Sequence, residues 1–238
     1  MPNELILIIT IIVEFSLTLV WYRLFGVKGL FALMAILTVL ANIEVLILVR
    51  AFGMEQTLGN ILFASTFLIT DIISETSDKE NAKKAANIGI AASITFVLIS
   101  TSWLLYTPSV NDVAFPHIKA IFSGTPRVII ASLVAYAICQ RLDVWLYHKI
   151  WHITTRRTGS GTARLYVRNN AATLISQLLN TIIFNVAAFA GTYDFMTLLS
   201  IIGAGYVIFI VTSLLDTPFL YIARRIGRRR YPKGSESV

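Results

Sequence analysis

Long apolar stretches separated by short polar segments dominate the chain. A helix needs about 20 mostly apolar residues to cross the ~30 Å hydrocarbon core of a bilayer. Seven stretches approach or reach that length, and we expect each of them to be a transmembrane helix. They are residues 5–22, 30–49, 58–74, 86–106, 128–146, 170–191 and 196–221.

The third stretch, 58–74, is the least regular of the seven. It is short, and its apolar run is interrupted by Gly59, Asn60, Thr70 and Asp71. The pattern therefore predicts a tilted, broken or partly re-entrant segment as readily as a straight span.

Composition supports a membrane protein. The 238 residues are 56% hydrophobic and only 14% charged, whereas a soluble domain carries about 25% charged residues. These values exclude a water-soluble domain and a disordered chain. We therefore predict an all-α integral membrane protein with seven transmembrane helices.

The formal net charge of +7 is a possible sign of nucleic-acid binding until the basic residues are placed. Alternating the loops between the two sides puts 17 of the 20 Lys and Arg residues on one side. By the positive-inside rule, the N-terminus lies outside and the C-terminus in the cytoplasm of a cell-membrane protein. The basic clusters are then topology signals beside acidic lipid headgroups, and we expect no nucleic-acid partner.

Few residues offer catalytic or metal chemistry. Cys139 is the single cysteine and lies in an apolar run, while His117, His148 and His152 are scattered in the segments between spans. No Ser–His, Cys–His or His–metal constellation falls within the spans. We expect no metal, no cofactor and no enzymatic activity.

Polar side chains recur at helical spacing inside three spans, and a fourth span, the seventh, contributes further polar residues. Each costs free energy in lipid unless it has a partner or lines a wet cavity. Ser, Thr and Asn often bridge helices by hydrogen bonds worth ~0.6 kcal/mol, but bulky amides pack poorly and favour a hydrogen-bonding surface. The stripes are Asn60, Phe63, Phe67, Asp71 and Ser74; Ser132, Tyr136, Gln140 and Asp143; Asn169, Thr173, Gln177, Asn180 and Phe184; and Tyr206, Thr212, Ser213 and Asp216.

Amides, carboxylates and aromatic rings facing one cavity favour a small, flat, polar solute. Amides and carboxylates pair with a ring edge, and aromatic side chains stack on the ring face. A sugar site also uses amides, whereas an ion pore needs rings of carbonyls or carboxylates. The predicted substrate-binding residues are Asn60, Phe67, Thr70, Asp71, Tyr136, Gln140, Asp143, Gln177 and Asn180.

Two further carboxylates lie in the first two spans. A central charge costs about 3 kcal/mol or more, so Glu14 and Glu44 are protonated, paired with each other or with Arg50, or in contact with a wet cavity. A proton-coupling role for Glu14 stays open.

Four motifs follow one another in a fixed order. They are Gly59 to Glu75 (GNILFASTFLITDIISE) with Lys83-Lys84; Arg127 with Ala131-Ser132 and Gln140-x-x-Asp143; Asn169 or Asn170 with Ser176-Gln177 and Asn180-Thr181; and Thr217-Pro218 with Tyr221. In these motifs the chain resembles the queuosine precursor transporters, also called the vitamin-uptake-like family. It departs from the family at Asn180, where members often have Asp, and at Ile208, where a lysine is expected.

The resemblance implies a six-helix transporter core at 30–226, preceded by an extra transmembrane helix at 1–29 and followed by a basic cytoplasmic tail at 227–238. It also implies import of a 7-deazaguanine base, such as 7-cyano- or 7-aminomethyl-7-deazaguanine or queuine. A guanine-like edge presents amino, N–H and carbonyl groups in a row, which a carboxylate and two amides complement.

Two other functions stay open. One is the substrate-binding subunit of an energised vitamin importer, which needs ATPase partners. The other is a non-transporting membrane scaffold that uses the basic loops. The expected partners are a small-molecule substrate and the lipid bilayer, while the energy source and the oligomeric state, a homo-oligomer included, are not determined by the sequence.

Overall fold

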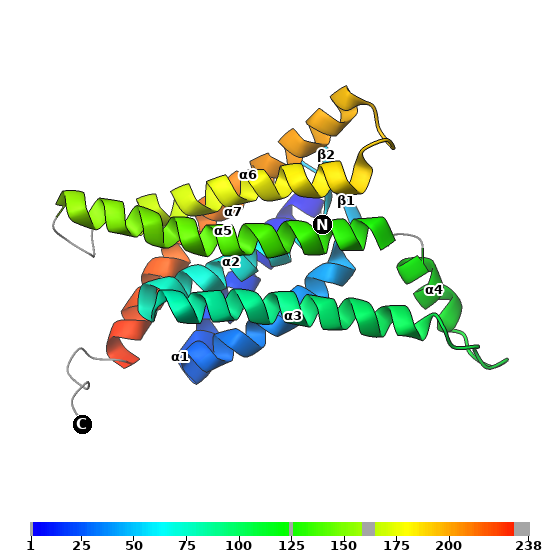
Figure 1. Cartoon of the computed structure of the whole chain (residues 1–238), viewed down its shortest axis with the longest axis horizontal. Coiled ribbons are helices and arrows are strands. Elements are labelled where there is room, and N and C mark those ends of the chain that lie inside the picture. The colour runs from blue at the N-terminus through cyan, green and yellow to red at the C-terminus, as the bar shows by residue number, and fades with distance from the viewer. Residues whose placement is uncertain (1, 124–125, 159–164, 231–238) are drawn as a thin grey trace.

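A computed structural model describes residues 2–123, 126–158 and 165–230, and nearly all of them are helical (Figure 1). The predicted all-α class is confirmed, with one small hairpin added. The last eight residues of the predicted basic tail, 231–238, lie outside the described residues. The elements are α1 (Asn3–Glu44), β1 (Leu48–Ala51), β2 (Met54–Thr57), α2 (Gly59–Thr76), α3 (Lys79–Trp103), α4 (Phe115–Ser123), α5 (Pro126–Thr158), α6 (Leu165–Phe189) and α7 (Phe195–Arg230).

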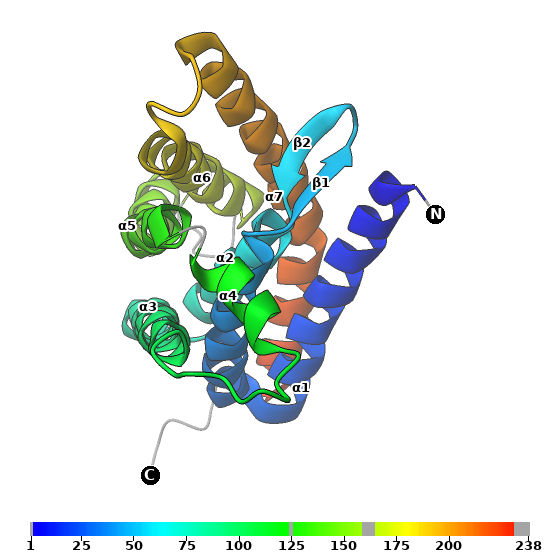
Figure 2. The same cartoon turned by 90° about the vertical axis from the view of Figure 1, so that its right-hand side faces the viewer.

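Helix α1 consists of two arms joined by a sharp reversal at Gly26. Its 42 residues would extend about 63 Å if straight, twice the thickness of the hydrocarbon core. Gly26 adopts φ 67° and ψ −151°, a conformation that residues with a Cβ rarely reach. Asn3 Nδ2 donates to Arg50 O at 2.9 Å, so the start of the first arm lies beside the segment that follows the second (Figure 2). The two arms correspond to the first two predicted spans.

The prediction that the second span extends to residue 49 is wrong at its C-terminal end. The helix stops at Glu44, and β1 pairs antiparallel with β2. Phe52 and Gly53 form the two-residue turn with φ of 53° and 74°, and such positive φ values match the twist of a hairpin. The continuing apolar run at 45–49 is equally compatible with helix and strand, so it did not mark the boundary.

Helix α2 is a continuous 18-residue helix in which 15 residues are buried. It contacts α1, α3, α5 and α7 and lies among them in the end-on view (Figure 2). Because protein rather than lipid surrounds it, α2 accommodates the polar residues that made its sequence irregular.

The remaining predicted spans fall within helices whose ends differ from the prediction. Helix α3 begins seven residues before the predicted residue 86 and ends at Trp103, and α6 begins at Leu165. The segment between the fourth and fifth predicted spans contains the short helix α4.

Among the described residues, five helices are long and apolar enough to cross a membrane: α1, α3, α5, α6 and α7. Large apolar side chains such as Leu98, Ile138 and Leu214 are exposed on α3, α5 and α7. A stable helix that exposes apolar side chains over much of its surface is suited to lipid. The chain is a multi-pass membrane protein.

Candidate functional site

The polar stripes of α2, α5, α6 and α7 converge inside the helix bundle. Gln140 Nε2 donates to Thr70 Oγ1 at 2.9 Å and to Thr66 O at 3.3 Å, which joins α5 to α2. Spacings of three and four residues put the stripes of α2, α5 and α6 each on one helix face, and hydrogen bonds join Ser213 and Asp216 of α7 to α6. We call the resulting group the interior polar cluster. Its members, all at most 3% exposed, are Thr70, Asp71, Gln140, Asp143, Asn169, Thr173, Ser176, Gln177 and Asp216.

Helix α6 supplies a hydrogen-bond donor to each carboxylate of the interior polar cluster. Thr173 Oγ1 donates to Asp71 Oδ2 at 3.3 Å, and Ser176 Oγ donates to Asp143 Oδ1 at 2.7 Å. Asn169 Nδ2 donates to Asp216 Oδ1 at 2.7 Å. The three carboxylates therefore have neutral donors, and among the described residues none of them forms an ion pair.

Several buried polar atoms of the cluster have no hydrogen-bond partner in the described part of the chain. Five are acceptors and one, Gln177 Nε2, is an N–H donor. An unsatisfied buried polar atom costs about 1–3 kcal/mol, so this concentration marks a place where a ligand can supply the missing donors. The acceptors are Asp71 Oδ1, Gln140 Oε1, Asp143 Oδ2, Asn169 Oδ1 and Gln177 Oε1.

The structure divides the predicted binding residues among three places. Thr70, Asp71, Gln140, Asp143 and Gln177 lie in the interior polar cluster. Phe67 is buried on α2 one turn before Asp71, and its carbonyl accepts a hydrogen bond from Thr70 at 2.9 Å.

Tyr136 is buried, but its hydroxyl is directed to α1. It lies 3.3 Å from Met34 Sδ, and its ring is 5.5 Å from that of Phe63. Its aromatic ring contacts α2 through Phe63.

Asn60 and Asn180 lie apart from the cluster, near the start of α2. Both line a pocket of about 100 Å³ between α2, α6 and α7, together with Phe184 and Asn185. They also line a smaller pocket with Ser132. We call this region the Asn60 end of the bundle.

The opposite end of α2 carries an ion-pair network that the sequence analysis missed. Glu75 pairs with Arg168 of α6 and, at 3.2 Å, with Arg224 of α7. Tyr147 of α5 donates to Glu75 Oε2 at 2.9 Å. The Arg168 and Glu75 side chains are 0% and 3% exposed, so four helices meet at a buried charge. We call this region the Glu75 end.

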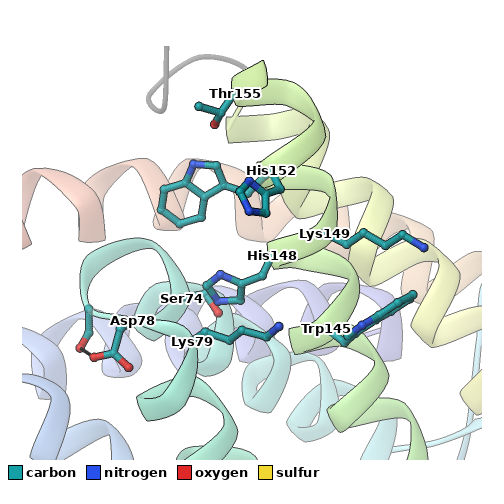
Figure 3. Close-up of a pocket in the computed structure, with 10 residues that line it drawn as sticks. Ser74, Asp78, Lys79, Trp145, His148, Lys149, His152 and Thr155 are labelled. Carbon is teal, nitrogen blue, oxygen red and sulfur yellow. Dashed lines mark hydrogen bonds between the residues drawn. The ribbon is translucent and has the colours of Figure 1, made fainter. Parts of the chain in front are cut away.

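A cavity of about 730 Å³ opens beside the Glu75 end. Trp145, His148 and His152 of α5 face Ser74, Asp78 and Lys79 across it (Figure 3). Asp78 Oδ1 accepts from the Asn81 backbone N–H at 2.8 Å, and this bond at the start of α3 holds the pKa of Asp78 below its usual value. The two histidines thus line a cavity rather than lying in loops.

The remaining acidic and histidine residues do not form a metal centre in the described residues, where no group of three or more His, Cys, Asp or Glu side chains is suited to a metal ion. Glu14 Oε2 accepts from Ser65 Oγ at 2.8 Å, so this carboxylate joins α1 to α2. Glu44 is the last residue of α1.

Sequence comparisons relate the chain to transport proteins. A family model described as "Putative vitamin uptake transporter" matches residues 57–223, which include every member of the interior polar cluster. The chain is 34% identical over 215 residues to a Bacillus subtilis (strain 168) protein named "Probable queuosine precursor transporter", an alignment that covers 90% of this chain and 92% of that protein. No solved structure matches the chain.

Proposed function

The chain belongs to the vitamin uptake transporter family, and on that premise we propose that it imports a queuosine precursor. The substrate is a 7-deazaguanine base, such as 7-cyano- or 7-aminomethyl-7-deazaguanine or queuine. The name of the Bacillus subtilis relative supports this substrate class. The interior polar cluster, which has more unpartnered acceptors than donors, also supports this substrate class.

The observation that carries the proposal is the set of unpartnered acceptors in the cluster. Asp71 Oδ1, Gln140 Oε1 and Gln177 Oε1 lack donors, and a deazaguanine edge offers an N–H and an exocyclic amino group. Gln177 Nε2 also lacks a partner and can donate to the ring carbonyl. The base would thus satisfy both kinds of orphaned atom at once.

The flat ring also needs apolar contacts above and below its face. Phe67 of α2 and the Tyr136 ring of α5 are both buried next to cluster residues on their helices. Stacking on such rings is worth about 1–3 kcal/mol per base. In this proposal they hold the ring face, and Asn60 and Asn180 line the approach to the cluster.

We further propose seven spans with the N-terminus outside and the C-terminus in the cytoplasm. The two arms of α1, the buried α2 and the four other long helices supply the seven. The core is residues 30–226 and the first arm of α1 is an addition to it. The asymmetric distribution of Lys and Arg supports this orientation and puts the Glu75 end at the cytoplasmic side.

Uptake by the purified protein in liposomes tests the proposed function. Labelled precursor should accumulate faster than in empty liposomes, without ATP or partner proteins. Asp71→Asn removes a charged acceptor with little change of shape, and such hydrogen bonds contribute about 1.5–3 kcal/mol. We expect a loss of uptake of about 10- to 100-fold for Asp71→Asn and for Gln140→Ala.

Cys139→Ala is the matched control, because Cys139 is buried beside Gln140 on α5 but is not part of the cluster. Wild-type activity in Cys139→Ala, with loss in the two cluster variants, supports the site. Saturable binding without uptake by the purified protein favours the subunit of an energised importer. If the purified protein shows neither binding nor uptake, the non-transporting membrane scaffold is the function that remains.

A further inference from the structure

Asp216 is a buried carboxylate that the substrate site leaves unused. It lies on α7 with 2% exposure, and its Oδ1 accepts from Asn169 Nδ2 at 2.7 Å. No ion pair to Asp216 occurs within the described residues. A buried carboxylate without a counter-ion is costly, and it becomes neutral by binding a proton or meets a cation.

The side chain that binds Asp216 lacks a donor of its own. Asn169 is 0% exposed, and its Oδ1 has no partner although its Nδ2 is bonded to Asp216. Asn169 thus presents an unpaired acceptor oxygen beside a carboxylate, and this pair of groups lacks a hydrogen-bond donor. A proton on Asp216 changes an acceptor oxygen into a donor and relieves this shortage.

The charges around Asp216 do not neutralise it. Asp71 of α2 and Asp143 of α5 lie near enough to Asp216 for like charges on these carboxylates to repel one another. The nearby basic residues, Arg168 of α6 and Arg224 of α7, both pair with Glu75 of α2.

Helix α1 also packs on α7, and among the described residues no ion pair joins α1 to Asp216. The contact includes the rings of Phe15 and Phe219, whose centroids are 5.3 Å apart. The Glu14 carboxylate in the same arm is bonded to Ser65. The three aspartates therefore share an excess of negative charge.

The backbone beside Asp216 is adapted to bend. Pro218 lies inside α7, and a proline lacks the N–H that would bond the carbonyl four residues earlier, here that of Leu214. Thr217 Oγ1 bonds the Ser213 carbonyl at 3.3 Å and accepts from Asn170 Nδ2 at 2.8 Å. A change in the charge of Asp216 thus occurs where α7 lacks a backbone hydrogen bond and where α7 is hydrogen-bonded to α6.

We propose that Asp216 carries a proton that enters with the solute and leaves with it, so that the chain is a proton-coupled transporter. The inference rests on the proposed function and adds its energy source. A proton from the outside solution binds the Asp216 carboxylate as the solute binds Asp71 and Gln140. The loaded cluster, with Asp216 neutralised, then opens to the other side, and the solute and the proton are both released there.

Two assays on proteoliposomes separate coupling from transport. Exchange of labelled for unlabelled precursor at equal pH needs solute movement only, whereas accumulation against a gradient needs the proton. The wild type should accumulate precursor up to about tenfold for each unit of pH difference, with proton entry followed by a trapped pH dye. Asp216→Asn should lose the accumulation that a pH gradient drives, and its remaining exchange should not vary with pH, because an amide keeps the shape but cannot titrate.

Other outcomes overturn the inference. Wild-type accumulation driven by a sodium gradient but not by a proton gradient contradicts it, as does normal accumulation by Asp216→Asn. If Asp216→Asn does not fold, the wild-type gradients still decide, and Asp216→Glu should retain accumulation with a shifted pH profile. Wild-type exchange without any accumulation driven by a pH gradient refutes the coupling alone, whereas absence of exchange in the wild type refutes the proposed function and the coupling together.

Discussion

The two ends of the central helix α2 are closed in different ways. At the Glu75 end, a buried carboxylate joins α2 to Arg168 of α6 and Arg224 of α7, and Tyr147 of α5 adds a hydrogen bond. At the Asn60 end, amides and aromatic rings line two small pockets, and no described ion pair joins the helices there.

The difference matters because the interior polar cluster lies between the ends. Buried charges are costly to separate, since each would lose its partner in a medium of low dielectric constant. Amide contacts are worth about 1 kcal/mol each and are easily exchanged for contacts to water or solute. The helices are therefore held together more firmly at the Glu75 end than at the Asn60 end.

Loss of Arg168 should give the largest effect. Arg168→Ala leaves Glu75 buried with a weaker set of partners, and breaking a buried ion pair costs about 3–5 kcal/mol. Thermal unfolding of the purified protein in detergent measures the change.

Lys83→Ala is the control for Arg168→Ala. It removes an ion pair with Glu80 whose side chains are 49% and 78% exposed, and such surface pairs contribute about 0–1 kcal/mol. Equal shifts in the two variants would show that the network at the Glu75 end does not hold the helices together.

A smaller effect is expected at the Asn60 end, and on binding rather than on stability. Asn180→Ala should weaken precursor affinity by about tenfold, which is the loss of one hydrogen bond of about 1.4 kcal/mol, with little change in unfolding temperature. A binding titration of Asn180→Ala beside Asn87→Ala, an exposed asparagine on α3, checks this. A large fall in unfolding temperature would contradict the contrast between the ends.

The smallest effect concerns the start of α3 at the rim of the Glu75-end cavity. Asp78 accepts the Asn81 N–H, and replacing a residue of this kind with Ala costs about 1 kcal/mol. Because the pKa of Asp78 is lowered on folding, its contribution is present above the unfolded-state pKa and is lost as the pH falls through the folded-state value. Unfolding of wild type and Asp78→Ala should therefore differ at neutral pH and converge in acid, and a constant difference would contradict this role.

The sequence predicts the helical elements and stripes well because both follow from periodicity. The spacing of Gln140 and Asp143 placed them on one face of α5, and the structure puts both in the interior polar cluster. The partner of Gln140 is Thr70, 70 residues away. Such a pairing depends on how whole helices pack, which no local pattern contains.

Other features were visible in the sequence but were compatible with two structural interpretations. Arg168 counted as one of many basic residues between spans, although it shares a face of α6 with Ala172 and Ser176, and all three are buried. Gly26 marked only a gap between two spans, and its positive φ became evident from the fold. The apolar residues before Phe52 are as compatible with helix as with strand, and the hairpin turn needs positive φ at Phe52, a non-glycine residue, which is uncommon.

A structure of the protein with 7-aminomethyl-7-deazaguanine bound tests the central claim most directly. The account predicts that the ring edge lies within hydrogen-bond distance of Asp71 Oδ1, Gln140 Oε1 and the Gln177 amide, with Phe67 or Tyr136 against its face. A base bound instead in the cavity between Trp145 and Asp78, with the interior polar cluster unchanged, would contradict it.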